Sequence, residues 1–253
     1  MIIVSKIQIE SLPTKKDRRL YVYLPKGYDK SEERYPVLYM FDGHNVFYDS
    51  HATYGKSWGM REYMKRTKLP LIIVAVECNH EGNKRLSEYS PYDFNARRMG
   101  RIEGRGKQTM DWIVNELKPY IDETYRTIPD RDHTMIAGSS MGGLMAVYAL
   151  TAYNDVFSRA AALSPAIMFG AKELRSLIDE TKFQKPTRLY MDVGTLEVPK
   201  GRLDRLAGLF DLAGRMTRKG VEVSAQIVPG AEHCEAAWEK RIPTFMDYLG
   251  QDL

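Results

Sequence analysis

The sequence lacks several features that would assign a protein to a class at once. It contains only two cysteines in 253 residues, Cys78 and Cys234, too few for a disulfide framework or a cysteine-based metal site. No apolar run approaches the roughly 20 residues that span a bilayer, so we expect no contact with a membrane. The net charge of +4 is spread along the chain without a long basic run, which gives no indication of nucleic-acid binding.

The first residues also lack a basic stretch ahead of an apolar core. We therefore expect no secretory leader and a cytoplasmic location. No repeat, low-complexity tract or proline-rich linker divides the chain. Because 253 residues with 43% hydrophobic composition can bury one sizeable core, we expect a single α/β domain over residues 1–253.

Strand-like and helix-like segments alternate along the chain. Residues 2–9 and 20–24 carry alternating or β-branched apolar side chains and predict an antiparallel lead-in. Continuous apolar runs predict buried strands, and apolar residues at helical intervals predict helices. Strands are expected at residues 35–41, 69–77, 134–137, 160–163, 188–193 and 221–228, and helices at 60–64, 109–125, 142–153, 172–179, 202–219 and 236–249. This alternation predicts a mostly parallel sheet with helices on both faces and ligands at the carboxyl ends of its strands.

A glycine-rich motif follows the strand expected at residues 134–137. Residues 138–142, Gly-Ser-Ser-Met-Gly, fit the G-x-S-x-G nucleophile elbow, in which the middle serine sits on a strained turn between a strand and a helix. Ser140 is therefore the candidate nucleophile. The backbone N–H of Met141, at the start of the helix, would point to where a tetrahedral intermediate gathers negative charge.

A serine nucleophile needs a base, and the base needs an orienting acid. On a fold of this type the order along the chain is serine, acid, histidine, and His233 is the only histidine after Ser140. It lies in a loop between the last expected strand and the last expected helix. Two carboxylates near a strand end precede it. Glu197 follows the turn at residues 194–195 and can reach back toward an imidazole, so it is favoured over Asp192, which lies inside the strand.

The ordered motifs resemble the esterase D-like branch of the α/β-hydrolases, which includes feruloyl and acetylxylan esterases, siderophore esterases and S-formylglutathione hydrolase. The resemblance rests on residues 35–45, 118–122, 125–127, 138–143, 163–165, 194–197, 230–233 and 238. It implies an α/β-hydrolase fold with Ser140 as nucleophile, Glu197 as acid and His233 as base. Many relatives have aspartate where this chain has Glu197. The turn at residues 42–45 matches the family's first oxyanion loop, which implies the backbone N–H of His44 beside that of Met141.

A long polar segment, residues 79–105, lies between an expected strand and an expected helix. Segments of this length in a compact domain are often functional. The aromatic side chains of Tyr89, Tyr92 and Phe94 could stack on a sugar or an aromatic acid, and Arg85 could hold a carboxylate or a phosphate. A solvated loop that only packs on the sheet explains the segment equally well.

The predicted activity is that of a serine carboxylic-ester hydrolase acting on a short-acyl or hydroxycinnamoyl ester of a carbohydrate. The chemistry requires no cofactor and no metal, and the expected partner is a small-molecule or oligosaccharide ester. Three alternatives stay open: a siderophore trilactone esterase, an acyltransferase on the same fold, and a non-catalytic binding module. The complete order of serine, acid and histidine disfavours the last of these. No oligomeric state is predicted.

Overall fold

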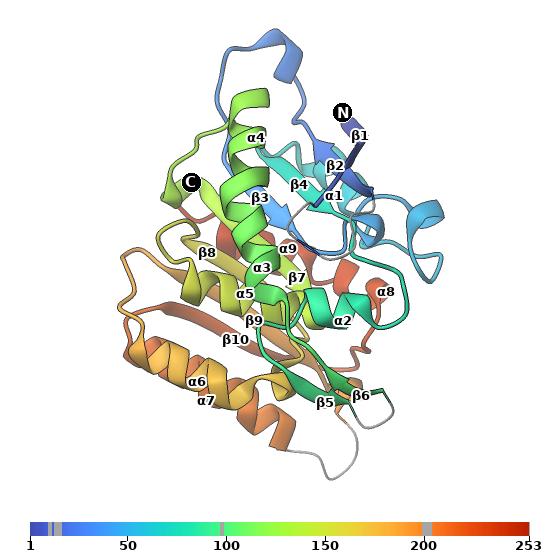
Figure 1. The fold of residues 1–253 in the computed structure, drawn as a ribbon. Helices are drawn as coiled ribbons and strands as arrows, with labels where there is room; N and C mark the ends of the chain where they lie inside the picture. Colours follow the sequence, from blue (N-terminus) through green and yellow to red (C-terminus); the bar gives the residue numbers. More distant parts are fainter. Residues whose placement is uncertain (10–11, 13–16, 97–98, 199–203, 253) are drawn as a thin grey trace.

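The computed structural model describes residues 1–9, 12, 17–96, 99–198 and 204–252. Within these residues, eight strands form one sheet in the order β1-β2-β4-β3-β7-β8-β9-β10, with helices on both faces (Figure 1). This arrangement confirms the predicted mostly parallel α/β sheet with an antiparallel lead-in. No helix in the described part of the chain is long and apolar enough to cross a bilayer.

The N-terminal strands form the antiparallel edge of the sheet. β1 (Ile2–Ile7) pairs with β2 (Arg18–Tyr23), and β2 pairs with β4 (Ile72–Val76). The parallel part comprises β3 (Val37–Met40), β4, β7 (Thr134–Ser139), β8 (Arg159–Leu163), β9 (Arg188–Gly194) and β10 (Glu222–Val228). Every residue of β3, β7 and β8 is buried, which explains why these strands have continuous apolar runs rather than an alternating pattern.

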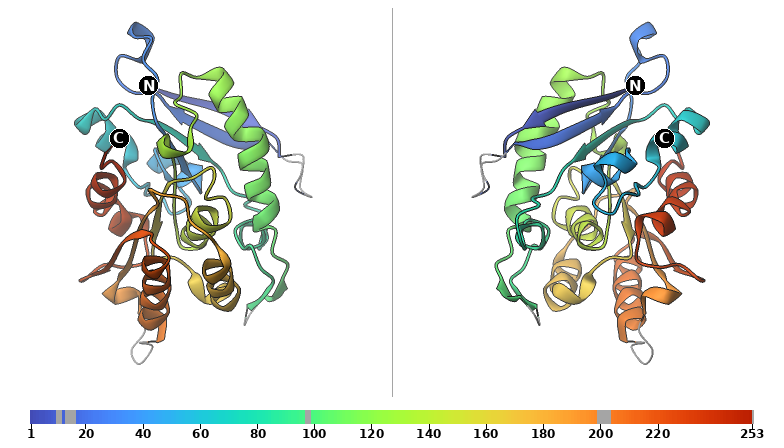
Figure 2. Two further views of the ribbon diagram at one scale, coloured as in Figure 1. Left: turned by 90° about the vertical axis from the view of Figure 1, so that its left-hand side faces the viewer. Right: turned by 90° about the vertical axis from the view of Figure 1, so that its right-hand side faces the viewer.

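Two groups of helices cover the two faces of the sheet (Figure 2). One face carries α3 (Gly106–Trp112), α5 (Met141–Ala152), α6 (Ala171–Glu180) and α7 (Asp204–Arg218). The other face carries α1 (Met60–Thr67), α8 (Glu235–Glu239) and α9 (Ile242–Leu249). α3 continues through the π-helical turn η4 (Ile113–Leu117) into α4 (Lys118–Thr124). α5 is buried almost all round, so its sequence is apolar on every side.

Two regions differ from the sequence-based expectation. The helix expected at residues 236–249 is divided into α8 and α9, because Pro243 lies in the first turn of α9 and cannot continue a preceding helix. Residues 79–105 are not one loop. They contain α2 (Lys84–Glu88) and a hairpin of β5 (Phe94–Ala96) and β6 (Gly100–Ile102), whose three-residue strands are too short to show a period. Residues 202 and 203 of the helix expected at 202–219 lie outside the described residues.

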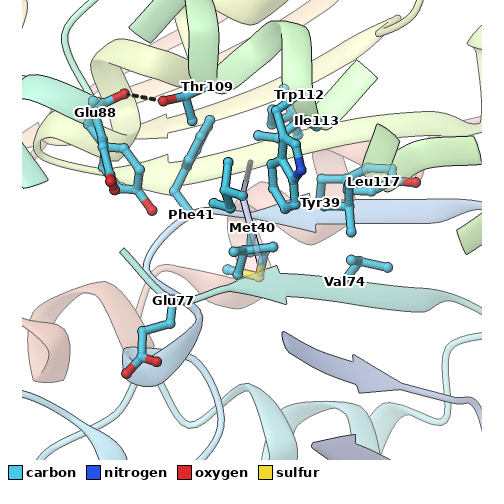
Figure 3. A pocket seen from close by; sticks show the side chains of 14 residues that line it. Tyr39, Met40, Phe41, Val74, Glu77, Glu88, Thr109, Trp112, Ile113 and Leu117 are labelled. Atoms are coloured by element: carbon cyan, nitrogen blue, oxygen red, sulfur yellow. Dashed lines mark hydrogen bonds between the residues drawn. The ribbon is translucent and has the colours of Figure 1, made fainter. Parts of the chain in front are cut away.

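A small cavity lies between strands β3 and β4 and the helix that begins with α3 (Figure 3). Its volume is about 20 Å³, and most of its lining is apolar, including Tyr39, Val74, Trp112 and Leu117. This is room for about one water molecule. The cavity is therefore a gap in core packing and is too small for a substrate.

Candidate active site

The chain turns sharply at Ser140, between β7 and α5. Ser140 has φ 56° and ψ −118°, a conformation that costs a non-glycine residue backbone strain. The neighbouring glycines permit the turn. A Cβ on Gly138 would lie 2.6 Å from the backbone of Gly142, and one on Gly143 would lie 3.0 Å from the carbonyl oxygen of Leu163. Since the N–H of Ser140 donates to that same oxygen (3.0 Å), the elbow is tied to the carboxyl end of β8.

A histidine and a carboxylate meet at the same edge of the sheet. His233 lies in the loop after β10, and Glu197 ends η7 (Thr195–Glu197), the turn after β9. Nδ1 of His233 is 2.8 Å from Oε2 of Glu197. The imidazole is 46% exposed, whereas the carboxylate is only 6% exposed. In the described chain no hydrogen bond joins the Ser140 hydroxyl to His233. Such contacts are often long in a protein without substrate.

The other carboxylate oxygen of Glu197 is held by three donors. Oε1 accepts hydrogen bonds from the Ser164 hydroxyl (2.7 Å), the N–H of Gly194 (2.8 Å) and Nη2 of Arg241 (3.0 Å). Burial by itself would raise the pKa of Glu197, but the hydrogen bonds from His233 and these three donors outweigh it and lower the pKa. The carboxylate is therefore ionised at neutral pH, as an acid that orients an imidazole must be.

Asp192, the alternative acid, has a different set of partners. It is fully buried in β9, where Oδ1 accepts a hydrogen bond from Arg241 (2.7 Å) and Oδ2 accepts one from the Tyr190 hydroxyl (2.9 Å). Burial raises the pKa of Asp192, although Arg241 opposes the shift. None of the hydrogen bonds of the described residues joins Asp192 to His233. Arg241 thus bridges the two carboxylates, and Glu197 is the one that faces the imidazole.

The sequence did not predict the residues that position Glu197. Ser164 has φ 47°, and its hydroxyl accepts hydrogen bonds from Trp238 Nε1 and Arg241 Nη1, both at 3.0 Å. Ser164 and Trp238 belong to motifs of the family resemblance, which is the signal that could have identified them. Arg241 lies in a polar stretch between two helices, where the sequence gives no sign that its side chain is buried.

The loop expected to supply the second oxyanion donor packs closely on the sheet. η2 (Gly43–Asn45) follows β3, and a Cβ on Gly43 would lie 2.6 Å from the backbone of Ala75 in β4. His44 and Met141 both lie in the first turn of a helix, where N–H groups have no partner within the helix. The His44 side chain is 2% exposed, and burial lowers its pKa to about 4, so the ring is neutral at neutral pH. The oxyanion roles of both N–H groups stay predictions.

Two residues expected to contact substrate, Arg85 and Tyr89, hold this loop, and the side chain of Arg85 stays partly exposed. Nε and Nη2 of Arg85 each donate to a carboxylate oxygen of Asp42 at 2.7 Å, and the Tyr89 hydroxyl accepts a hydrogen bond from the N–H of Asp42 at 3.1 Å. Tyr89 is 3% exposed and packs edge-on against Phe41. Because Tyr89 is buried against Phe41, its ring does not offer the stacking face that the sequence suggested.

The other two aromatic side chains of this segment differ in exposure. Phe94 is buried against Phe169, with ring centroids 4.4 Å apart, so it too lacks a free stacking face. Tyr92 is partly exposed. Its ring packs on Tyr148 and occupies the space that a Cβ on Gly170 would need. Of the predicted aromatic contacts, Tyr92 is the one with surface open to a ligand.

The Arg85–Asp42 pair leads to a prediction about stability. The substitution Arg85→Met leaves a nearly buried carboxylate without its partner, and we expect the free energy of unfolding to fall by about 3 kcal/mol. Urea denaturation measures this loss. The matched control is Arg101→Met, which removes an exposed pair with Asp93 and should cost less than about 1 kcal/mol. Equal losses in the two variants would contradict a structural role for Arg85.

The same pair predicts a dependence on acid. Burial would raise the pKa of Asp42, but the charge and hydrogen bonds of Arg85 outweigh it and lower the pKa. Because the pKa in the folded state is below the unfolded value of about 3.9, the stabilisation is complete above that value and is lost as pH falls through the folded pKa. In Arg85→Met the guanidinium no longer opposes the burial of Asp42, so this carboxyl should protonate above about pH 4, and the stability gap between wild type and variant should narrow as pH falls from there. A stability difference that stayed constant into strong acid would show that it does not come from the Arg85–Asp42 ion pair.

Comparison with known proteins identifies the family. The family model described as "Putative esterase" matches residues 11–248, nearly the whole chain. The chain belongs to this family. It is accordingly a carboxylic ester hydrolase, as its relatives named as esterases also indicate.

The relatives of this esterase are distant in sequence. It is 23% identical to the uncharacterized protein YbbA of Bacillus subtilis over 185 residues, which are 72% of this chain and 69% of YbbA. It is 26% identical to an endo-1,4-beta-xylanase/feruloyl esterase of Xylanibacter ruminicola over 148 residues, 56% of this chain. That match spans only 18% of the Xylanibacter protein, so the activity of the whole relative does not transfer with it.

Solved structures of similar proteins share the fold of the esterase. An IroE-like serine hydrolase from Shewanella oneidensis has a TM-score of 0.78 at 22% identity, with 98% of this chain and 79% of the other covered. The siderophore hydrolase EstB from Aspergillus nidulans has a TM-score of 0.69 at 18% identity, with 96% and 94% covered. These similarities confirm the predicted α/β-hydrolase fold.

Proposed function

We propose that the esterase forms an acyl-enzyme on Ser140, with His233 as general base and Glu197 as the acid that orients it. The contact of 2.8 Å between His233 Nδ1 and Glu197 Oε2 carries this proposal, because it lies at the edge where the strained turn presents the serine. When Nδ1–H donates to the carboxylate, the lone pair of the neutral imidazole is on Nε2. That nitrogen is then the one able to accept the proton of the serine hydroxyl.

The reaction proceeds in two stages. The Ser140 oxygen attacks the ester carbonyl while its proton passes to His233, and the N–H groups of Met141 and His44 stabilise the negative charge on the carbonyl oxygen. Collapse of this intermediate expels the alcohol, which takes the proton from the imidazolium. A water that gives its proton to His233 then attacks the acyl-serine, and collapse of the second intermediate releases the acid while the imidazolium returns the proton to the oxygen of Ser140. Glu197 stabilises the imidazolium in both stages.

The substrate that we propose is a short-acyl or hydroxycinnamoyl ester of a carbohydrate. Two exposed apolar side chains lie next to residues of the proposed site. Leu196 precedes Glu197, and Met168 lies two residues beyond Ala166, whose N–H donates to the carbonyl oxygen of Ser140. They can cover a short acyl group or one aromatic ring. Covering a long chain would need further apolar surface, since each buried methylene is worth about 0.8 kcal/mol.

Two features bear on the choice of alcohol and acid. Tyr92 lies against Gly170, directly after the turn η6 (Ile167–Phe169) that carries Met168, and its partly exposed ring is suited to stacking on a sugar. The Xylanibacter relative is named as a feruloyl esterase, which supports a hydroxycinnamoyl acid. Both features favour a plant-type carbohydrate ester over a simple alkyl ester.

A siderophore esterase remains the second candidate, and one of the solved neighbours is named as a siderophore hydrolase. Such an activity would use arginines to hold an anionic ligand. Three arginines of residues 79–105 are already paired with carboxylates: Arg85 with Asp42, Arg101 with Asp93, and Arg105 with Glu103. Because these three guanidinium groups already bind carboxylates, they are less available to hold an anionic siderophore. The arginines at positions 97 and 98 lie outside the described residues.

The substrate proposal predicts an order of activities. We expect kcat/KM to be high for nitrophenyl acetate and butyrate and at least about tenfold lower for palmitate, because the surface near the site is too small to bury a long chain. Acetylated or feruloylated oligosaccharides should exceed the nitrophenyl esters. Kinetics on this panel, with a ferric trilactone and an added alcohol acceptor, separates the hydrolase from the siderophore and acyltransferase alternatives.

A matched pair of variants tests the acyl contact. Leu196→Ser should lower kcat/KM for the feruloyl ester about fivefold, the effect of losing roughly 1 kcal/mol of apolar contact. Phe210→Ser removes another exposed apolar side chain, on α7, and should leave kcat/KM unchanged. A preference for palmitate, or an equal response of the two variants, would refute the proposed acyl site.

A further inference from the structure

Three potential metal ligands lie together beside the oxyanion loop. One imidazole nitrogen each of His44 and His80 and the sulfur of Cys78 lie within 4.8 Å of one another. His44 belongs to η2, whereas Cys78 and His80 follow β4, the strand on which η2 packs. The rings of the two histidines are in edge-to-face contact, with centroids 4.4 Å apart. The fold therefore gathers these three side chains from two separate segments.

Hydrogen bonds orient both imidazoles through the same nitrogen. Nε2 of His44 is 3.0 Å from the hydroxyl oxygen of Thr53, and Nε2 of His80 is 3.0 Å from Oε1 of Glu77. When each Nε2–H donates to its oxygen, the lone pair of each ring is on Nδ1. Histidines that bind a metal commonly donate their other N–H to a carboxylate or another acceptor. Both rings are thus held in the way that metal-binding histidines are held.

The strongest indication of a ligand is the Nδ1 atom of His44. This atom is buried, and it has no hydrogen-bond partner in the described chain. Leaving a buried polar atom unsatisfied costs about 1–3 kcal/mol. The proposed mechanism uses the backbone N–H of His44 and leaves its side chain without a function. A cation bound at Nδ1 would supply the missing partner.

We propose that His44, Cys78 and His80 form a binding site for a divalent ion of the zinc class. Two imidazoles and one thiolate are a donor set that zinc accepts, with water in the fourth position. Ligand atoms around tetrahedral zinc are about 3.5 Å apart, so separations of up to 4.8 Å close with a movement of about 1 Å. As the sulfur–metal bond forms, the S–H bond of Cys78 breaks and its proton passes to solvent. The half-exposed side chain of His80 gives the ion a path from solvent.

Occupancy of this site is expected to inhibit ester hydrolysis. Binding draws His44 toward Cys78 and His80, and a shift of about 1 Å in a group that acts on the reaction can lower its rate about 100-fold. The inhibition rests on the proposed oxyanion role of His44, whereas the binding site itself does not. The two claims therefore need separate measurements.

Cobalt(II) titration of the EDTA-treated full chain tests the binding site. We expect one equivalent to produce thiolate-to-cobalt charge-transfer absorption. It should vanish in Cys78→Ser, and in His80→Ala, where a half-exposed side chain is removed, the affinity should fall at least about tenfold. Cys234→Ser and His133→Ala alter a cysteine and a histidine outside the cluster and should bind as the wild type does. Absence of the absorption in the wild type, or its persistence in Cys78→Ser, would overturn the site.

Zinc titration of ester hydrolysis tests the coupling to the reaction. The wild-type rate should fall at least about tenfold on saturation, and the rate of His80→Ala, compared with its own metal-free rate, should fall far less at the same zinc concentration. Equal inhibition of both would place the inhibitory ion elsewhere and overturn the coupling. A loss of hydrolysis on EDTA treatment alone, reversed by zinc, would overturn both the inhibition by zinc and the metal-independent mechanism.

Discussion

Ester hydrolysis by Ser140→Ala is expected to fall about 10⁶-fold while the chain stays folded. The substitution removes only the hydroxyl group of the side chain. Loss of a triad serine leaves only the rate that binding and the oxyanion hole provide. The backbone contacts that form the elbow, including the N–H of Ser140 to Leu163, do not involve the side chain. Measurement of kcat/KM with nitrophenyl acetate, together with thermal unfolding, separates loss of chemistry from loss of fold.

The adjacent serine provides the matched control. Ser139 is the last residue of β7 and is buried, and Ser139→Ala should keep kcat/KM within about tenfold of the wild-type value. A serine-directed organophosphate should modify Ser140, as peptide mapping by mass spectrometry would detect. Modification of Ser139, or hydrolysis by Ser140→Ala at the wild-type rate, would reject the proposed nucleophile.

The second large effect is expected from Glu197→Gln, which should lower kcat about 10⁴-fold with little change in stability. The amide keeps the shape of the side chain, but it removes the negative charge that fixes the tautomer of His233 and stabilises the imidazolium. The contacts of Oε1 with Ser164, Gly194 and Arg241 can be kept by the amide oxygen. Steady-state kinetics measures kcat, and urea denaturation of the same preparation measures the free energy of unfolding.

Asp192→Asn is the comparison, and the opposite pattern is expected from it. Asp192 is fully enclosed and bound to Arg241 and Tyr190, so a neutral side chain leaves the buried guanidinium with less compensation and should lower the free energy of unfolding by about 3 kcal/mol. Its kcat should stay within about tenfold of the wild-type value, because His233 keeps its own partner. If Asp192→Asn lowered kcat and Glu197→Gln lowered only the stability, Asp192 would be the orienting acid and Glu197 the structural carboxylate.

The sequence predicted the parts of this protein that depend on local constraints. A turn with a non-glycine residue at φ 56° needs small neighbours, so the glycines around Ser140 mark the elbow in the sequence itself. Strands buried on both faces must be continuously apolar, and this composition predicts the parallel sheet. The order of Ser140, Glu197 and His233 along the chain is the one expected for a triad on this type of fold. Parallel strands bring the loops after their carboxyl ends to one edge, so these three residues are expected to lie together.

Tertiary packing decided which polar side chains are buried around these residues. Whether a polar side chain is buried depends on segments far away in the chain, and no local pattern records it. Arg241 resembles a solvated arginine in the sequence, yet it bridges Asp192 and Glu197. Tyr89 resembles a loop aromatic, yet it is buried, and its hydroxyl accepts a hydrogen bond from the N–H of Asp42 in the turn after β3.

The same reason explains why the sequence gave no sign of the His44, Cys78 and His80 cluster. Metal sites are recognised in a sequence when their ligands are regularly spaced, as in C-x-x-C pairs. Here one ligand comes from the loop after β3 and two from the segment after β4, and the distance between them is set by how closely Gly43 packs on Ala75. The sequence by itself determined the sheet, the elbow and the order of the proposed triad. Only the tertiary structure determined which charged groups support that triad and which side chains meet beside it, because those contacts depend on the packing of distant segments.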